Sequence, residues 1–261
     1  MIHQAYYFIK FLFQSNNAHG IHSPFVFDFY NKALRPDLQK NIDLFKKHKL
    51  FRSELINNNQ TIEVVDFGAG SKKINDNQRK VHQIAKTAGL SKRSAMKLIQ
   101  VTQFLQPVNV LELGTSVGLG TAALAMGNRE ANIKTLEGCP STSHIAQEMF
   151  EKYKLNNISI KTGDFKKTLP ETLKDQSFDM IYFDGNHQKE PTLEYFNLCL
   201  SNKSNQSVFI FDDIHWSKEM NEAWNEIKNH PESVVTIDTF QWGIVFFRKE
   251  QMKQHFILRV W

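Results

Sequence analysis

The sequence predicts an α/β fold in which a mixed sheet of seven strands carries helices on both faces. Short β-rich runs alternate with helical segments from Val108 onward, which is typical of parallel strands joined by helical crossovers. The last two β-rich runs are separated only by Gln241-Trp242, and a parallel partner would need a crossover of about a dozen residues. These two runs must therefore form an antiparallel hairpin, which makes the predicted sheet mixed.

Five β-rich runs form the wound part of the predicted sheet, and the hairpin completes it. The five runs are Val108–Leu113, Ile133–Glu137, Ile158–Thr162, Phe178–Phe183 and Ser207–Phe211, and the hairpin runs are Val234–Phe240 and Gly243–Arg248. Helices are expected over Thr121–Met126, over Ser141–Lys152 with Ser141 as the N-cap, over Thr192–Leu200 and over Lys218–Lys228. Gly163-Asp164, after the third run, is expected to be a turn.

The first 90 residues differ from this pattern. Residues 1–90 are predicted to form a mostly helical N-terminal extension or lid, ahead of a domain over residues 91–261. Helices are expected over Ile2–Phe13, Phe25–Leu34, Asp43–Ile56, Gln78–Ala88 and Ser91–Leu105, and a loop over Asn16–Pro24. The aromatic side chains of Phe25, Phe27, Phe29 and Tyr30 are interpreted as a core or docking face. The alternative is a lid, formed with His19 and His22, over an acceptor site.

The composition excludes several other classes of protein. The chain has 261 residues, of which 41% are hydrophobic and 23% are charged, as in ordinary globular proteins. Two cysteines are too few for a disulfide scaffold and favour a reducing compartment, so we expect a cytoplasmic protein. The apolar start is interrupted by Lys10 and lacks a basic leader, so no secretory signal is predicted. No charge-free stretch approaches the roughly 18 residues that a membrane span needs.

The positive charge is concentrated before the C-terminal two-thirds of the chain. Residues 40–97 carry 13 basic and 5 acidic side chains, which is a net charge of +8, whereas residues 98–261 carry 16 basic and 20 acidic side chains, which is −4. This segment is interpreted as a set of solvated helix faces. The alternative is an electropositive approach for an anionic substrate, either a phosphorylated molecule or a nucleic acid.

Two segments combine a strand, an acidic residue and a glycine-rich turn, as nucleotide-binding loops do. Such a loop needs a helix directly after it and an acidic side chain at the end of the next strand. Val64–Gly70 meets neither condition and is interpreted as a turn over the substrate opening. Leu111–Gly120 meets both, because a helix is expected from Thr121 and Glu137 ends the next strand. The spacing Gly114-x3-Gly118-x-Gly120 is neither the dinucleotide form nor a phosphate loop.

These motifs resemble those of the class I S-adenosylmethionine-dependent methyltransferases, which have a Rossmann-like fold of five wound strands and a closing hairpin. Within that class the chain looks most like the catechol and caffeoyl-coenzyme A O-methyltransferases, over residues 91–248. The resemblance rests on Leu111-Glu112-Leu113-Gly114-x3-Gly118, Leu136-Glu137, Phe183-Asp184-Gly185-Asn186-His187 and Phe211-Asp212-Asp213. Residues 1–90 match no characterised activity.

The resemblance implies a site for S-adenosylmethionine. The loop from Gly114 to Gly118 would hold the methionine part of the cofactor, with the backbone amides and the Thr115 or Ser116 hydroxyl facing its carboxylate. Glu137 would accept hydrogen bonds from the ribose hydroxyls. The remaining implied cofactor residues are Asp164, which would accept from the adenine amino group, Phe165 beside it, Glu112, which would orient the loop, and Asp184.

The resemblance also implies a metal site and a catalytic group. Asp184, Asp212 and Asp213 end the fourth and fifth strands, where the family holds Mg²⁺ or another divalent cation that binds the substrate hydroxyl. The chain departs from the family, because Asp212-Asp213 replaces Asp-Asn and His187 replaces a catalytic lysine. His187 can serve as a general base, with Asp184 beside it. Metal dependence is therefore left open. His215 is expected to line the pocket or to pack.

The function implied is O-methylation of a small-molecule hydroxyl, with an anionic acceptor as an option and with or without a divalent metal. One alternative is an RNA methyltransferase that uses residues 40–97. The stretch Asp184-Gly185-Asn186-His187 argues against base N-methylation, because those enzymes commonly carry an Asn/Asp-Pro-Pro-aromatic stretch there. Another alternative is a cofactor-binding protein without transfer activity. Whether the chain forms a homodimer is left open.

Overall fold

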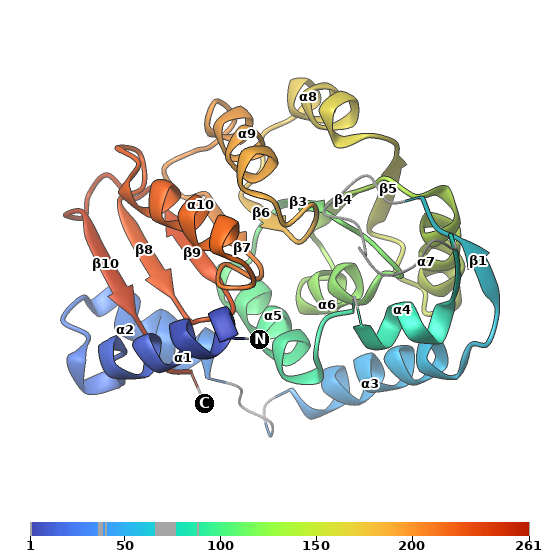
Figure 1. The fold of residues 1–261 in the computed structure, drawn as a ribbon, viewed down its shortest axis with the longest axis horizontal. Helices are drawn as coiled ribbons and strands as arrows, with labels where there is room; N and C mark the ends of the chain where they lie inside the picture. Colours follow the sequence, from blue (N-terminus) through green and yellow to red (C-terminus); the bar gives the residue numbers. More distant parts are fainter. Residues whose placement is uncertain (1, 36–38, 40, 66–76, 88, 261) are drawn as a thin grey trace.

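The main sheet of the computed structural model has eight strands in the order β10-β8-β9-β7-β6-β3-β4-β5 (Figure 1). The structure describes residues 2–35, 39, 41–65, 77–87 and 89–260. The strands are β3 (Asn109–Leu113), β4 (Asn132–Glu137), β5 (Ile158–Thr162), β6 (Met180–Phe183), β7 (Val208–Phe211), β8 (Val235–Asp238), β9 (Gly243–Phe246) and β10 (Gln254–Ile257). Strands β3 to β7 are parallel, and β9 is antiparallel to both β7 and β8.

The predicted fold class is confirmed, including the hairpin, but the number of strands is corrected from seven to eight. The eighth strand, β10, pairs in parallel with β8 at the edge of the sheet. It has no alternation of buried and exposed positions that a sequence pattern could reveal, because its first two residues are exposed and its last two are half-buried. A second correction concerns Gln78–Lys80, which was expected to be helical. It forms β2, antiparallel to β1 (Thr61–Glu63), and helix α4 (Val81–Thr87) follows it.

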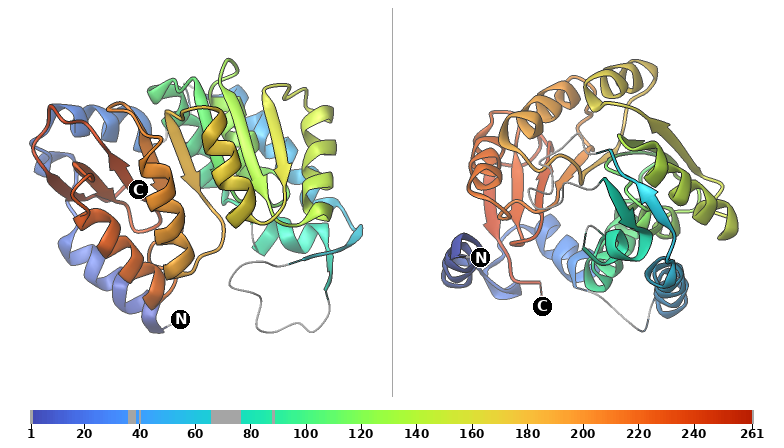
Figure 2. Two further views of the ribbon diagram at one scale, coloured as in Figure 1. Left: turned by 90° about the horizontal axis from the view of Figure 1, so that it is seen from above. Right: turned by 45° about the vertical axis from the view of Figure 1, so that its right-hand side comes forward.

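Helices cover both faces of the sheet (Figure 2). One face carries α2 (Pro24–Phe29), the π-helix η2 (Tyr30–Leu34), α3 (Ile42–Asn57), α4, α5 (Lys92–Leu105), α6 (Leu119–Gly127) and α7 (Pro140–Lys152), and the other carries α8 (Phe165–Asp175), α9 (Lys189–Leu200) and α10 (Lys218–Asn229). Neighbouring strand residues such as Val110 and Leu111 enter opposite cores, as the two-residue period of a strand requires. No helix among the described residues is long and apolar enough to cross a bilayer.

Two helix starts differ from the sequence-based expectation. The turn at Gly163-Asp164 opens helix α8, where the Asp164 side chain accepts a hydrogen bond of 2.9 Å from the backbone N–H of Lys166 as an N-cap. Helix α7 begins at Pro140 with Cys139 as the N-cap, two residues before the expected cap. Proline suits the first helical position because its missing N–H would have no intrahelical partner there.

The aromatic segment near the N-terminus packs as core. Phe29 is fully buried, and its ring centroid lies 5.2 Å from that of Phe246 in β9 and 5.6 Å from that of Phe104 in α5. The Tyr30 hydroxyl donates a hydrogen bond of 2.7 Å to the backbone oxygen of Arg259. Phe27 is the exception and remains 44% exposed. These contacts support the core interpretation, while the division of the chain at residue 90 stays a prediction.

The expected loop over residues 16–24 contains one short 3₁₀ turn, η1 (Ala18–Gly20), after helix α1 (Ile2–Gln14). Asn16 connects this loop to the end of β10, since its N–H donates to the Ile257 carbonyl at 2.8 Å and its carbonyl accepts from the Arg259 N–H at 3.0 Å. The N-terminal segment is thus hydrogen-bonded to the last strand of the chain. Of the turn expected over Val64–Gly70, residues 66–70 lie outside the described residues.

Candidate functional site

A cleft with a volume of about 690 Å³ opens at the carboxyl edge of the parallel strands. Ligands bind at this edge in open α/β sheets. The cleft wall includes nine predicted site residues, which are Gly114, Ser116, Glu137, Asp164, Phe165, Asp184, His187, Asp212 and Asp213. The chain therefore brings most of the predicted cofactor, catalytic and metal residues into one space.

Glu137 is fixed at the end of β4 by backbone donors. Its carboxylate accepts a hydrogen bond of 2.7 Å from the N–H of Ser116 and another of 2.9 Å from the N–H of Cys139. Burial raises the pKa of Glu137, and these two backbone hydrogen bonds act in the opposite direction. Each carboxylate oxygen can accept a second hydrogen bond. Glu137 therefore presents a positioned acceptor pair to the cleft.

The turn after β3 needs glycine at its first position. Gly114 has a φ of 108°, a conformation that side chains rarely adopt, and a Cβ there would collide with the backbone oxygen of Asp184. Ser116, two residues on, also has a positive φ of 49°. The backbone is thus held close to the cleft, where its amides can approach a ligand.

Three predicted cofactor residues lie behind the cleft and do not line it. Glu112 is fully buried, and its carboxylate accepts hydrogen bonds from the hydroxyls of Thr121 and, at 2.7 Å, Thr135. The Thr115 hydroxyl lies 2.6 Å from the Thr135 hydroxyl, and Gly118 is the N-cap of α6 with a φ of 85°. These three residues support the turn after β3 from the interior of the domain. Burial raises the pKa of Glu112 to about 7, although its two threonine hydrogen bonds lower it.

The turn between β5 and α8 brings Asp164 and Phe165 to the wall of the cleft. Asp164 already accepts a hydrogen bond as the N-cap of α8, and a carboxylate has acceptor capacity left for a ligand. The Phe165 ring packs edge-on against Tyr195, with centroids 5.9 Å apart. It also lies against Gly185, where a Cβ would come within 3.0 Å of the ring. The ring therefore has a fixed position at the cleft.

The three aspartates meet at the ends of β6 and β7, as predicted. Burial raises the pKa of Asp184 well above its ordinary value, and the charges of Asp212 and Asp213 raise it further. Burial and Asp213 also raise the pKa of Asp212. However, within the described ranges no three His, Cys, Asp or Glu side chains converge as the ligands of a metal ion would. We therefore derive no step through a metal ion.

His187 lies beside these carboxylates. Its Nε2 is 3.8 Å from Asp184 Oδ1, and its side chain is 26% exposed. Burial lowers the pKa of His187, although the charge of Asp213 opposes the shift, so the imidazole is neutral at neutral pH. A neutral imidazole can accept a proton.

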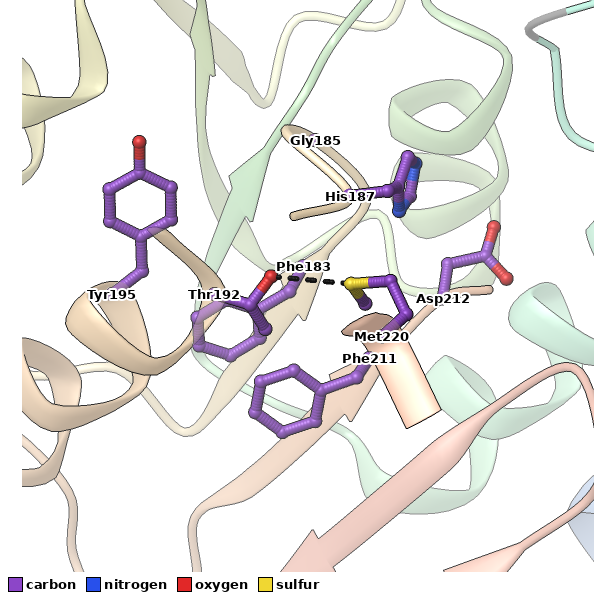
Figure 3. Close-up of a pocket in the computed structure, with 8 residues that line it drawn as sticks. All are labelled: Phe183, Gly185, His187, Thr192, Tyr195, Phe211, Asp212 and Met220. Atoms are coloured by element: carbon purple, nitrogen blue, oxygen red, sulfur yellow. Dashed lines mark hydrogen bonds between the residues drawn. The ribbon is translucent and has the colours of Figure 1, made fainter. Parts of the chain in front are cut away.

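Side chains fill most of the space beneath His187 (Figure 3). Only a small hollow of about 10 Å³ remains there, lined in part by Phe183, Phe211 and Met220. The Thr192 hydroxyl donates to the Met220 sulfur at 3.6 Å across it. A hollow of this size has room for one water molecule at most. Ligands must therefore approach His187 from the open side of the cleft.

Several residues of the cleft wall were not predicted. Arg79 of β2 and Ile84 and Thr87 of α4 line it from the N-terminal segment, and Lys166 and Trp216 line it from the loops of the sheet. The Nε atom of Arg79 is buried and has no hydrogen-bond partner among the described residues. The net positive charge of residues 40–97 was the available signal for Arg79, but it does not identify which cation enters the cleft.

His215 is buried next to the cleft without lining it. Its Nε2 lies 2.9 Å from Asp238 Oδ2, and its Nδ1 lies 2.8 Å from Asn221 Oδ1. Its ring is also stacked between Tyr7 and Phe240. Of the two interpretations from the sequence, packing therefore holds for His215.

Comparison with known proteins identifies the class of this domain. Residues 111–214 match a family described as a methyltransferase domain. An O-methyltransferase from Bacillus cereus in complex with SAH is 22% identical and covers 61% of this chain and 83% of its own, with a TM-score of 0.53. An SAH-bound methyltransferase from Podospora anserina is 16% identical and covers 78% of this chain and 87% of its own, with a TM-score of 0.58. A putative caffeoyl-CoA O-methyltransferase from Staphylococcus aureus is 17% identical and covers 55% of this chain and 76% of its own, with a TM-score of 0.50.

No curated protein sequence matches the chain. The family match and the shared fold confirm the predicted resemblance to class I S-adenosylmethionine-dependent methyltransferases. Residues 111–214 are therefore similar to a methyltransferase domain.

Proposed function

We propose that this methyltransferase domain binds S-adenosylmethionine in the cleft and transfers its methyl group to a hydroxyl oxygen of a small anionic molecule. The main support for the proposal is that Glu137 and His187 line the same cleft. Glu137 is held by a hydrogen bond from the Ser116 N–H, and His187 is a neutral base. One end of this cleft suits a ribose, and the other suits a hydroxyl that must lose a proton.

The residues of the cleft fit the cofactor. Glu137 would accept from the ribose hydroxyls, the backbone at Gly114 and Ser116 would hold the methionine part, and Asp164 and Phe165 would hold the adenine. The cofactor supplies an electrophilic methyl group on a sulfonium ion. The space that Gly114 leaves beside the Asp184 carbonyl supports this assignment, because it lets the backbone approach a ligand closely.

His187 would take the proton from the acceptor hydroxyl. The reaction needs a positioned nucleophile and the removal of one proton, and a neutral imidazole in the cleft can do both tasks by accepting a hydrogen bond from the hydroxyl. Asp184 lies 3.8 Å from the imidazole, and the charge of Asp213, which raises the pKa of His187, would stabilise the imidazolium that forms. Once the methyl–sulfur bond has broken and the methyl–oxygen bond has formed, His187 would release the proton to solvent.

The acceptor is proposed to be anionic because cations line the cleft. Arg79 and Lys166 both contribute to its wall, and the buried Nε of Arg79 has no partner among the described residues. An unpaired buried donor favours a ligand that supplies an acceptor, and a guanidinium matches carboxylate and phosphate groups. Arg79 and Lys166 thus favour a hydroxylated acid or phosphate as the acceptor, although five carboxylates from the described ranges line the same cleft. The Arg79 contribution also supports a lid role for the segment before residue 90.

A divalent cation at Asp184, Asp212 and Asp213 stays an alternative. The carboxylates repel one another, and either protons or a cation would relieve this repulsion. An RNA acceptor also stays an alternative, which the net charge of residues 40–97 supports. A cofactor-binding protein without transfer activity is the third alternative. Assembly as a homodimer stays open.

One assay separates these alternatives. The full chain is incubated with S-adenosylmethionine labelled at the methyl group and with a panel of hydroxylated carboxylates and phosphates, with their neutral esters, and with RNA. We expect label in the anionic small molecules, with the same rate in the presence of EDTA. A rate that EDTA abolishes and Mg²⁺ restores would establish the metal. Label in RNA only would favour the second alternative, and cofactor binding without any transfer would favour the third.

A further inference from the structure

A second cavity, with a volume of about 130 Å³, lies between helices α1 and α10. Its wall includes Lys10 of α1, Lys228 of α10 and the ends of β8 and β10. In Figure 1, α1 passes across the carboxyl ends of β10 and β8, next to α10. The 690 Å³ cleft shares no lining residue with this cavity. It is therefore a separate space, and the proposed methyl transfer does not use it.

Two cations face this cavity without an anionic partner. Neither Lys10 nor Lys228 forms an ion pair with any described residue. Burial lowers the pKa of Lys228, the charge of Asp238 opposes this shift, and repulsion from the Lys10 ammonium adds to it. Lysine side chains that converge on one cavity raise the free energy of the empty site, and an anion between them would lower it.

Asp238 is the one carboxylate among the described residues of this wall, and its charge offsets only part of the charge of the two lysines. Its Oδ2 accepts hydrogen bonds from His215 Nε2 at 2.9 Å and from Trp224 Nε1 at 3.2 Å, and its Oδ1 accepts from the Phe240 N–H at 2.8 Å. Three groups thus donate hydrogen bonds to this carboxylate from inside the domain. Two lysines against one carboxylate leave the cavity with a net positive charge.

The rest of the wall is partly polar, with Gln14, Asn221 and Asn225, and partly apolar and aromatic. Tyr7 and Phe11 of α1 and Ile257 of β10 line the cavity beside the two lysines. The Tyr7 ring is held by stacking on His215, with centroids 5.7 Å apart. A cavity of roughly this volume in another protein accommodates benzene. The space therefore has about the size of one ring, and the two lysines are available at its wall for a charged group on that ring.

We propose that the cavity between α1 and α10 binds a small organic carboxylate, whose oxygens face Lys10 and Lys228 and whose apolar part contacts Tyr7, Phe11 and Ile257. Benzoate has this shape and charge and serves as the probe. Benzamide has nearly the same shape without the charge.

The test is isothermal titration calorimetry of the full chain, saturated with S-adenosylhomocysteine, with benzoate and with benzamide. We expect benzoate to bind with a Kd in the millimolar range or below, and benzamide to bind at least about tenfold more weakly. Lys228→Met and Lys10→Met should each weaken benzoate at least about fivefold, whereas Lys228→Arg should retain it. Lys10 is exposed, so Lys10→Met leaves a folded protein to measure even where Lys228→Met does not.

Two control variants test whether benzoate binds in the cavity between α1 and α10. Lys218→Met removes an exposed lysine from the same helix and should leave the affinity for benzoate unchanged. Arg79→Met removes a cation from the 690 Å³ cleft and should also leave it unchanged. The proposal is overturned if benzoate does not bind at 10 mM, if both lysine variants bind it as the wild type does, or if Arg79→Met is the variant that loses it. None of these outcomes depends on whether methyl transfer occurs.

Discussion

The carboxylate of Glu137 accepts a hydrogen bond of 2.7 Å from the backbone N–H of Ser116, and this contact joins the ends of two neighbouring strands. Glu137 ends β4, and Ser116 lies in the turn after β3. The acid proposed to hold the ribose and the turn proposed to hold the methionine part are therefore fixed to each other before any ligand binds. Preorganisation of this kind lowers the entropic cost of binding.

The first prediction concerns Glu137. The substitution Glu137→Gln keeps the size of the side chain but replaces one acceptor oxygen by a donor, which then faces the N–H of Ser116 or Cys139. We expect the affinity for S-adenosylhomocysteine to fall by about tenfold or more, as for other lost charge-assisted hydrogen bonds. Calorimetric titration measures this change. Glu130→Gln, at an exposed position before β4, is the control and should bind as the wild type does; equal affinities for all three proteins would contradict the role of Glu137.

The second prediction concerns His187. Replacing it by glutamine removes the proposed base while keeping a polar side chain of similar reach. We expect kcat with the acceptor from the screen to fall by on the order of a hundredfold or more, with the affinity for S-adenosylhomocysteine unchanged. His144→Gln, on the exposed face of α7, should leave both values unchanged. A His187→Gln enzyme with wild-type kcat would show that another group takes the proton.

The third prediction concerns the charge of the acceptor. Arg79→Met and Lys166→Met each remove one cation from the cleft. We expect each substitution to raise KM for an anionic acceptor by about tenfold and to change kcat little, because the lost interaction holds the bound acceptor and its transition state alike. Lys80→Met, exposed beside Arg79, is the matched control. If KM for the neutral ester of the acceptor rose by as much, the two cations would not recognise the charge of the acceptor.

The fourth prediction concerns the pH dependence of stability. Burial raises the pKa of Glu112 to about 7 from an ordinary value of 4.5, so the folded chain holds this proton more tightly than the unfolded chain. The resulting stability is fully present below pH 4.5 and is lost as pH rises through 7. Relative to Glu112→Gln, we expect the wild type to lose on the order of 2–3 kcal/mol of unfolding free energy between pH 4.5 and pH 8.

Urea unfolding of the ligand-free proteins at several pH values checks this. The quantity to follow is the difference in unfolding free energy between wild type and variant, because the contributions of groups that titrate in both proteins cancel. A difference that stays constant across this pH range would mean that Glu112 is ionised throughout in the folded chain.

The fifth prediction concerns Gly114. A Cβ at this residue would collide with the backbone oxygen of Asp184, and the φ of 108° is unfavourable for alanine. We expect Gly114→Ala to lower the unfolding free energy by about 1–3 kcal/mol and to weaken cofactor binding together with it. Thermal unfolding and calorimetric titration measure the two effects. A variant with wild-type stability and affinity would contradict the proposed close approach of this turn.

The strands at the centre of the sheet could be predicted because burial imposes a strong pattern on them. The strands β6 and β7 are buried at every position and appear in the sequence as apolar runs. Strand β10 could not be predicted in the same way, since it lies at the edge and leaves Gln254 and His255 exposed. Helix α8 was missed because its first residues follow Gly163-Asp164, a dipeptide that is equally common in turns.

The candidate site was predictable where a residue's place follows from the end of a strand. Glu137, Asp184, Asp212 and Asp213 reach the cleft because the carboxyl ends of parallel strands meet at one edge. The direction of a side chain within a turn does not follow from that rule. The Thr115 or the Ser116 hydroxyl was therefore expected to face the cofactor. The Thr115 hydroxyl lies against Thr135 inside the domain, and of the two only Ser116 lines the cleft. Arg79 reaches the cleft by the packing of a segment distant in sequence, which spacing alone does not show.

The crystal structure of the full chain grown with S-adenosylhomocysteine is the most direct test of the account. We expect density for the nucleoside in the 690 Å³ cleft, with the ribose hydroxyls within hydrogen-bonding distance of the Glu137 carboxylate and the sulfur facing His187. Density for the nucleoside elsewhere, or a ribose with no contact to Glu137 at full occupancy, would contradict it.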